Sequence, residues 1–197
     1  MLNLPDVTLV CIEQLRPAKA LDLMAEMVRL ANFGNVLWAS NFFGYEEMIR
    51  TENTIHEQVR TSHLLTVHLD GFILNPDLWN SAWLQYDYIG APWPASRYAH
   101  RVGNSGFCLR SVRLSRRVQE LPVIQTNYDL LVSQEHRTQL EHEGFKFAPL
   151  EEAARFSEEL PIPETPERTF GFHGKWPERI KAPPPPYYFN NREATGT

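Results

Sequence analysis

Residues 7–12, which read VTLVCI, begin the stretch of sequence that decides the fold, and residues 36–39, which read VLWA, end it. The first run is almost continuously apolar and rich in β-branched residues, which is typical of a strand buried on both faces of a parallel sheet. Between the runs, Pro17 can begin a helix, and residues 20–31 repeat apolar positions at helical spacing before Gly34. Strand, helix and strand predict a βαβ unit with parallel strands and a right-handed crossover.

Downstream segments extend this pattern. Residues 63–69 form an apolar strand that ends at Asp70, and residues 102–110 resemble a strand interrupted by two glycines and followed by a short basic helix. Residues 129–143 are predicted as one amphipathic helix, and residues 146–148 as a short strand. The expected fold class is α/β, with a mixed, mostly parallel central sheet flanked by helices.

The composition limits the class of protein. A chain of 197 residues, of which 43% are apolar, can bury one sizeable core but hardly two. The 24 acidic residues outnumber the 19 lysines and arginines, and the formal charge of -5 argues against a protein held to nucleic acid by its overall charge. The sequence contains no apolar run of about 18 residues and no basic leader, so we expect a cytoplasmic protein without a membrane span.

The two cysteines and the proline-rich end give further expectations. Cys11 and Cys108 lie in apolar runs and are predicted to be buried free thiols, which fits a reducing compartment. Residues 181–197 contain four consecutive prolines and a polar end, which is typical of an extended, partly flexible tail.

Asp70 is the strongest single candidate for chemistry. It follows a strand, is followed by Gly71, and stands where open parallel sheets bind ligands. Its carboxylate can hold a hard cation such as Mg²⁺ or Mn²⁺, which would bridge a diphosphate. His68 lies two residues earlier, on the same face of the strand. An Asp–Gly pair is also an ordinary turn and a strand histidine is often simply packed, so both interpretations stay open.

A glycine-rich loop precedes the basic helix and consists of Gly103, Asn104, Ser105 and Gly106. Its glycines let the backbone approach something flat or bulky, and the amide of Asn104 can then bind sugar hydroxyls. A bulge or turn is the plain alternative. The arginines that follow, Arg110, Arg113, Arg116 and Arg117, can neutralise a diphosphate or a phosphorylated acceptor, or can form a solvated helix face.

Three later residues and an aromatic stretch complete the candidates. Asp129 opens a helix and is either a capping group or, in a pocket, a base for an acceptor hydroxyl. His173 lies between glycines, where an imidazole can ligate a metal, and Lys175 can meet a phosphate. Trp93 belongs to a stretch dense in aromatic residues, which indicates core packing or a platform on which a sugar can stack.

Several unusual short sequence motifs occur together in this chain. Residues 66–76 (TVHLDGFILNP), 86–93 (YDYIGAPW) and 102–111 (VGNSGFCLRS) resemble the family of uncharacterised proteins named DUF5672. Residues 147–149, 154–157 and 170–174 also match, so the resemblance covers about residues 6–176. That family is regarded as glycosyltransferase-like with a GT-A fold, which implies a single Rossmann-like, GT-A-like domain over residues 1–180.

The resemblance also suggests roles for particular residues. In the wider GT-A group that includes the glycogenin-like family, Asp70 would be the second acid of an Asp-x-Asp metal motif and Asn104 the amide of the sugar loop. Asp129 would be the acid near the reacting centre and His173 a late metal ligand. The chain departs from that pattern in having His68 for the first acid, Ser105 for a glycine and Tyr128 for the partner of an acidic pair.

On this basis we expect a glycosyltransferase that uses a nucleoside-diphosphate sugar, UDP-linked, with Mn²⁺ or Mg²⁺ as cofactor. The donor-binding residues would be Cys11, Ile12, Glu13, Asp70, Gly71, Gly103, Asn104, Ser105, Gly106 and Lys175. The metal ligands would be Asp70, His173 and His68, the catalytic residue Asp129, and the acceptor-binding residues Trp93, Arg110 and Arg113.

The partners would be the donor and an acceptor glycan. Because of the basic helix, the alternative acceptor is nucleic acid with hydroxymethylated bases. Because His68 replaces an acid, a second alternative is a non-catalytic module that binds a nucleotide or sugar. A metal-dependent phosphohydrolase is a third.

Overall fold

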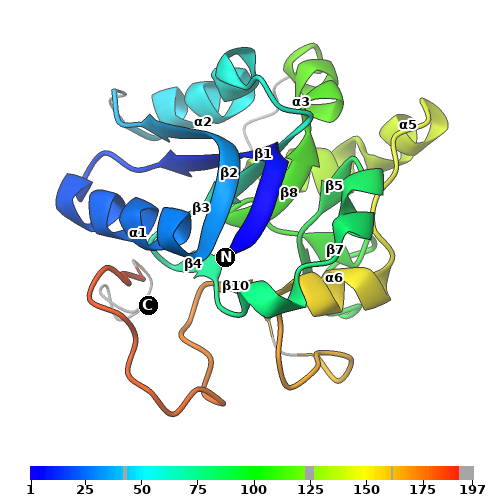
Figure 1. The fold of residues 1–197 in the computed structure, drawn as a ribbon. Helices are drawn as coiled ribbons and strands as arrows, with labels where there is room; N and C mark the ends of the chain where they lie inside the picture. Colours follow the sequence, from blue (N-terminus) through cyan, green and yellow to red (C-terminus); the bar gives the residue numbers. More distant parts are fainter. Residues whose placement is uncertain (42–43, 123–126, 161, 191–197) are drawn as a thin grey trace.

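The computed structural model describes residues 1–41, 44–122, 127–160 and 162–190. Its main sheet has the strand order β2-β1-β3-β8-β5 (Figure 1). The strands are β1 (Leu2–Ile12), β2 (Ala31–Ala39), β3 (His63–Val67), β5 (Tyr88–Ile89) and β8 (Phe107–Ser111). β1 pairs in parallel with β2 and β3, whereas β8 is antiparallel to both β3 and β5. Every strand except β8 therefore runs in one direction, which confirms the expected mostly parallel α/β sheet.

The βαβ unit forms as predicted, with longer strands. Helix α1 (Pro17–Leu30) has its proline at the first turn and buries Ala20, Leu23, Met24 and Met27 against the sheet. Along β1, Leu9 and Cys11 join the core beneath α1, while Val10 and Ile12 join a second apolar cluster. Both faces of β1 are thus covered, which explains its continuous apolar sequence.

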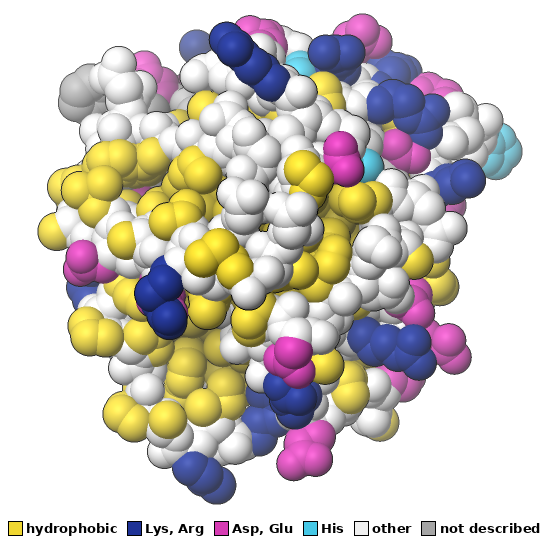
Figure 2. Space-filling model, in the orientation of Figure 1, with side chains coloured by type: hydrophobic (Ala, Val, Ile, Leu, Met, Phe, Trp, Pro, Cys, Tyr) yellow, Lys and Arg dark blue, Asp and Glu magenta, His cyan; other side chains and the backbone are white. Residues whose placement is uncertain are grey.

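Helices cover both faces of the sheet. α1 lies on one face, and α2 (Gly44–Thr54), the 3₁₀ turn η1 (Ile55–Gln58) and α3 (Val112–Gln119) pack on the other (Figure 1). Apolar side chains reach the surface on the side where α1 lies (Figure 2), and Leu21 and Val28 of that helix are exposed. None of the helices in the described part of the chain has the length and apolar character that a bilayer crossing requires.

The prediction of one helix over residues 129–143 is wrong. The segment consists of α4 (Tyr128–Leu130), a π-helical turn η4 (Leu131–Glu135) and α5 (Arg137–His142). The N–H of His136 bonds five residues back, to the carbonyl of Leu131 (3.0 Å), and the backbone of His136 leaves the helical region. The predicted strand 146–148 is also absent, because only an isolated bridge joins Phe147 to Tyr88.

A smaller layer lies beside the main sheet. Its three-stranded sheet has the order β4-β10-β9, formed by Gly71–Ile73, Gly171–His173 and Ser157–Glu158. The remaining elements are β6 (Ala91–Pro92) paired with β7 (Val102–Gly103), helix α6 (Leu150–Phe156), and the 3₁₀ turns η2 (Pro76–Leu78) and η3 (Ser81–Gln85). Antiparallel pairing of β10 with β4 sets His173 opposite Gly71, which follows Asp70.

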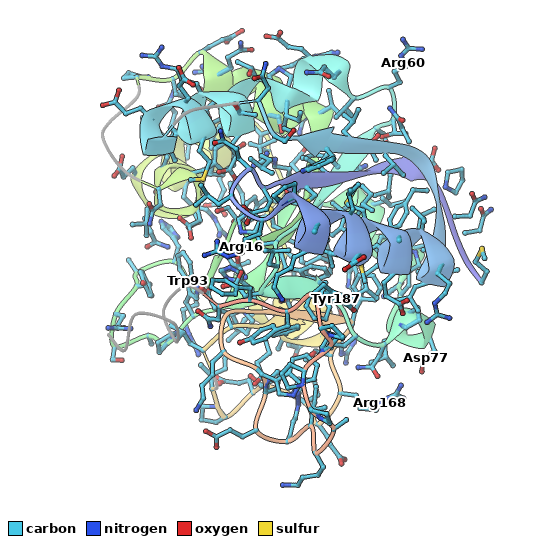
Figure 3. All side chains as sticks on the ribbon, turned by 90° about the vertical axis from the view of Figure 1, so that its left-hand side faces the viewer. Arg16, Arg60, Asp77, Trp93, Arg168 and Tyr187 are labelled. Atoms are coloured by element: carbon cyan, nitrogen blue, oxygen red, sulfur yellow. The ribbon has the colours of Figure 1, made fainter. Side chains whose placement is uncertain are left out.

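The segment after the prolines packs on this layer. The N–H of Phe189 bonds the carbonyl of Leu69 (3.1 Å), and the Tyr188 hydroxyl bonds the carbonyl of Gly174 (3.1 Å). The guanidinium of Arg16 lies 3.6 Å from the centre of the Phe189 ring, and Tyr187 lies on the same side of the molecule as Arg16 (Figure 3). Aromatic burial thus holds residues 187–189, part of the tail expected to be flexible, while residues 191–197 lie outside the described residues.

Asp87 joins three segments at the amino end of β3. Its carboxylate accepts hydrogen bonds from the Ser111 hydroxyl (2.6 Å), the Arg113 guanidinium (2.6 Å) and the N–H of Lys146 (2.9 Å). Burial opposes the charged form, but these hydrogen bonds outweigh it and lower the pKa of Asp87. Its contribution to stability is therefore complete above the ordinary value of 3.8 and is lost as the pH falls through the lowered pKa.

We predict that Asp87→Asn lowers the free energy of unfolding by about 2–3 kcal/mol at neutral pH, because buried donors lose a charged acceptor. The measurement is urea denaturation followed by circular dichroism. The difference from the wild type should shrink below pH 3.8, where the Asp87 carboxylate begins to lose its charge. Asp77→Asn is the control: its pair with Arg168 is exposed (Figure 3), so it should cost at most about 1 kcal/mol. Equal losses in the two variants would contradict the role assigned to Asp87.

Candidate functional site

The site begins at the carboxyl end of β3. His68 and Gly71 exchange two backbone hydrogen bonds (2.8 and 3.0 Å) and close a tight turn that contains Asp70. The adjacent carboxyl end of β1 places Cys11 opposite Val67, one residue before His68. The turn thus stands at the edge of the sheet where α/β folds commonly bind ligands.

Three side chains converge at this turn. Ligand atoms of His68, Asp70 and His173 all lie within 4.8 Å of one another. Nε2 of His173 is 3.6 Å from Oδ1 of Asp70, and the two imidazole rings meet edge to face with centroids 5.8 Å apart. Pairing of β10 with β4 brings His173 next to His68 and Asp70, which lie about a hundred positions earlier in the sequence.

Glu159 orients the late histidine. One of its oxygens lies 3.3 Å from Nδ1 of His173, and the other accepts a hydrogen bond from the indole of Trp93. A carboxylate on Nδ1 fixes the imidazole so that Nε2 faces Asp70, the arrangement that supports metal-ligating histidines in proteins. The sequence analysis missed Glu159, which directly follows the short strand β9 and is connected to the site only through folding.

Burial and charge set the protonation of this cluster. Burial, and next the neighbouring His173, lower the pKa of His68 to about 4, so this imidazole is neutral near pH 7. Burial would also lower the pKa of His173, but the hydrogen bond to Glu159 and the charge of Asp70 raise it above its ordinary value. Burial, and then the negative charge of Glu159, raise the pKa of Asp129.

The residues present fit a divalent metal. Ligand atoms about 2.1 Å from an octahedral ion lie roughly 3 Å apart, so small side-chain rotations would let His68, Asp70 and His173 share one ion. The donor set of two imidazoles and one carboxylate suits a transition metal such as Mn²⁺ better than Mg²⁺, which prefers oxygen ligands.

The glycine-rich loop packs directly against the cluster. A Cβ on Gly106 would lie 2.1 Å from Nε2 of His173, and one on Gly103 would lie 2.2 Å from the Trp93 ring. The glycines of the loop predicted that its backbone approaches a flat or bulky group. The rings of His173 and Trp93 are the groups that it approaches. Ser105, between the glycines, is half-buried.

Asn104 shapes this loop from within. Its backbone has a φ of 84°, and its side-chain oxygen accepts hydrogen bonds from the N–H groups of Gly106 (2.7 Å) and Phe107 (3.3 Å). The side chain is fully buried, and its NH₂ group has no hydrogen-bond partner among the described residues. The amide that was expected to bind sugar hydroxyls is thus buried, and its oxygen bonds within the loop itself.

The remaining donor-site candidates lie on both sides of the cluster. Cys11 and Ile12 are buried at the end of β1, and Glu13 accepts a hydrogen bond from the N–H of Arg16 (3.0 Å). Lys175, two residues after His173, forms an exposed ion pair with Glu178 (2.7 Å).

Two of the acceptor-binding expectations do not fit the structure. Arg110 is fully buried, pairs with Glu52 (3.4 Å) and lies 4.1 Å from the centre of the Tyr128 ring, so its side chain offers no surface to an acceptor. Arg113 binds Asp87 at the opposite end of the sheet, because antiparallel β8 ends beside His63 rather than beside His68. Trp93 does lie at the cluster but is almost wholly buried and stacks on Tyr98.

The comparisons with known proteins found a similarity to one protein family and similarities to solved structures. A family model described as "Protein of unknown function (DUF5672)" matches residues 29–173. Among solved structures, the chain is similar to the "crystal structure of a glycosyltransferase involved in the glycosylation of the major capsid of PBCV-1", with 10% sequence identity and a TM-score of 0.48. That alignment covers 85% of this chain and 93% of the other. No curated protein matches.

We predict that Gly106→Ala displaces the His173 imidazole, since the new methyl group would overlap Nε2. The histidine ring signals of His173 and His68 in two-dimensional NMR should shift. Gly144→Ala is the matched control, because Gly144 has a φ of 85° and open space around it, so this variant adds backbone strain without touching the cluster. Unchanged His173 signals in Gly106→Ala would contradict the packing described here.

Proposed function

The chain belongs to the DUF5672 family of proteins of unknown function, and we propose that it is a glycosyltransferase that moves a sugar from a nucleoside-diphosphate donor, UDP-linked, to an acceptor hydroxyl. The observation that carries the proposal is the convergence of His68, Asp70 and His173 at the carboxyl end of β3. A metal held there would meet a diphosphate at the usual ligand-binding edge of an α/β sheet. The glycine loop beside it packs against the His173 ring and so supports one of the proposed ligands.

In the proposed reaction one bond breaks, one bond forms and one proton is transferred. The bond between the sugar carbon and the diphosphate oxygen breaks, and the diphosphate leaves with the electron pair. A new bond forms between that carbon and the acceptor oxygen, whose proton passes to a base. A bound divalent metal would supply positive charge where the leaving diphosphate becomes more negative.

Asp129 is the candidate base. Its raised pKa, caused first by burial and then by Glu159, makes its carboxylate a better proton acceptor than an exposed one. In a transfer that retains the sugar's configuration, Asp129 would instead position the donor or the acceptor. Cys11 to Glu13, at the end of β1, would border the nucleoside, and Lys175 would meet a phosphate.

Two of the three arginines of α3 lend little support to a nucleic-acid acceptor. Arg113 pairs with Asp87 and Arg117 with Glu143, at the sheet end away from the metal cluster. On the face shown in Figure 2, basic and acidic side chains lie next to one another rather than forming a basic surface. The non-catalytic module remains the alternative that experiment must separate from the transferase.

We predict that UDP binds in a Mn²⁺-dependent manner and that Asp70→Asn weakens this binding at least 100-fold, because it removes the charged metal ligand. Glu159→Gln, which acts through the orientation of His173, should weaken it about 10- to 100-fold. Isothermal titration calorimetry with and without Mn²⁺ measures both effects. Asp77→Asn, a surface carboxylate outside the site, is the control and should bind as the wild type does. Unchanged UDP binding in Asp70→Asn would refute the metal site.

We further predict slow hydrolysis of one sugar donor in a panel of nucleotide sugars, detected by mass spectrometry, since water can replace an unknown acceptor. If Asp129 is the base, Asp129→Asn should lower this rate by about 10²- to 10⁴-fold while UDP affinity stays unchanged. UDP binding without hydrolysis of any donor would favour the non-catalytic module. Release of phosphate from a simple diphosphate would favour a phosphohydrolase.

A further inference from the structure

Two hollows lie on the side of β9 and β10, and the first is lined by Glu159, which contacts His173. The first, of about 410 Å³, extends from Glu159 to Glu178, and the second, of about 470 Å³, extends from Leu74 to Pro185. Both are lined by Glu167, Trp176 and Arg179. We call these two neighbouring hollows together the Trp176 groove.

The groove begins at the proposed reacting centre. Glu159, at its inner end, also contacts His173 and Trp93. Lys175 and Trp176 follow His173 in the chain. Gly174, which has a φ of 94°, makes the turn between His173 and Lys175. Glu159 therefore belongs both to the lining of the groove and to the surroundings of His173.

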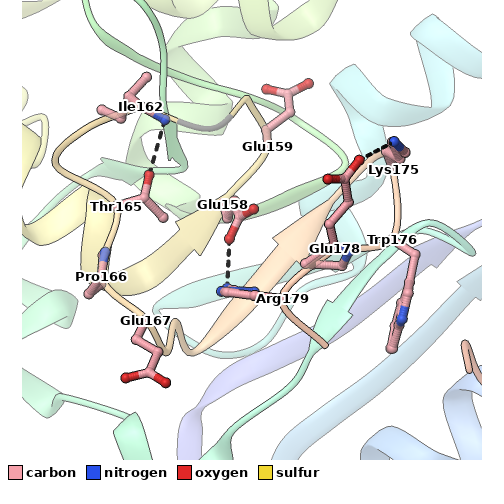
Figure 4. A pocket seen from close by; sticks show the side chains of 11 residues that line it. Glu158, Glu159, Ile162, Thr165, Pro166, Glu167, Lys175, Trp176, Glu178 and Arg179 are labelled. Atoms are coloured by element: carbon pink, nitrogen blue, oxygen red, sulfur yellow. Dashed lines mark hydrogen bonds and ion pairs between the residues drawn. The ribbon is translucent and has the colours of Figure 1, made fainter. Parts of the chain in front are cut away.

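Cations in the groove are paired with carboxylates. Arg179 binds Glu158 (2.6 Å), Lys175 binds Glu178 (2.7 Å) and Arg168 binds Asp77 (2.9 Å). Figure 4 shows the Arg179–Glu158 pair between segments 162–167 and 175–178. The first hollow has four carboxylates against two cations. A polyanion would meet repulsion there and would have to displace existing ion pairs.

The aromatic and carboxylate groups of the lining suit a polyhydroxylated ligand. Trp176 packs by its ring on Phe172 (5.4 Å between centroids) and Tyr188 (5.7 Å), which hold it in place. An indole in a fixed position offers an apolar surface to the C–H groups of a sugar ring. Carboxylates such as that of exposed Glu167 accept hydrogen bonds from hydroxyl groups.

We propose that the Trp176 groove is the acceptor subsite and that it binds a neutral, elongated glycan. This inference rests on the proposed glycosyltransferase function, whose acceptor it identifies by chemical class. The hydroxyl group at the inner end of the glycan would be the one that receives the sugar, and its proton would pass to the base at the metal cluster.

The test uses the full chain, labelled with ¹⁵N, with maltotriose and lactose as neutral probes. The indole N–H signal of Trp176, assigned from its absence in Trp176→Phe, should shift on titration with at least one of them. By saturation-transfer NMR, Trp176→Phe should bind that probe about tenfold more weakly. Trp79→Phe is the matched control, since Trp79 packs on Trp83 and Phe170 outside the groove, and its affinity should equal that of the wild type.

A second variant keeps the test independent of core packing. Glu167→Lys changes an exposed residue, so folding should be preserved, and it should weaken binding of the neutral probe at least threefold. Glu120→Lys is the control, because Glu120 directly follows α3, is distant from Glu167 in the sequence and is also exposed. This variant should bind the neutral probe as the wild type does. The proposal is overturned if neither neutral probe shifts the Trp176 signal. It is also overturned if a duplex oligonucleotide with hydroxymethylated cytosines shifts that signal more strongly.

Donor hydrolysis in the same samples separates this proposal from the one on which it rests. Donor hydrolysis without any response of Trp176 to the probes would leave the transferase standing and remove its acceptor subsite. A response of Trp176 without donor hydrolysis would support the groove as a glycan-binding site and refute the transferase.

Discussion

Pairing of β10 with β4 is the constraint on which the candidate site depends. β4 continues the chain from the end of β3, while β10 comes from a distant part of the sequence, and their hydrogen bonds set His173 opposite Gly71. Close packing follows from this register, because Gly71 and Gly106 both lie against the His173 ring with no room for a Cβ. Glu159 then holds that ring from its other nitrogen. A few backbone hydrogen bonds thus assemble groups that no local segment could bring together.

The βαβ unit and the turn at Asp70 were predictable from the sequence for local reasons. Strand β1 is apolar along its length because both of its faces are buried, and the α1 stripe follows the helical period. The segment from 129 to 143 was not predictable in this way, since its apolar spacing suits a helix but His136 interrupts it. Glu159 was not predictable either, because its importance comes from contacts with residues 66 and 14 positions away.

Arginine in this chain is mainly structural where the sequence suggested ligand binding. Arg110 is buried beside Glu52 and Tyr128, Arg113 ties α3 to Asp87, and Arg117 pairs with Glu143. Sequence spacing cannot reveal such partners, because each pair joins segments brought together only by folding. Pairing also changes what the surface can bind: a guanidinium already bound to a carboxylate attracts a phosphate much less than an unpaired one does.

The two cysteines flank the strand that leads to the cluster of His68, Asp70 and His173. Cys11 on β1 lies opposite Val67 of β3, and Cys108 on β8 lies opposite Thr66. Burial raises the pKa of both thiols to about 12, so about one in a hundred thousand is ionised at pH 7. An alkylating reagent can therefore react with them at an appreciable rate only when the sheet opens around β3. The rate at which these two thiols are alkylated therefore reports how often the strand that positions His68 and Asp70 opens.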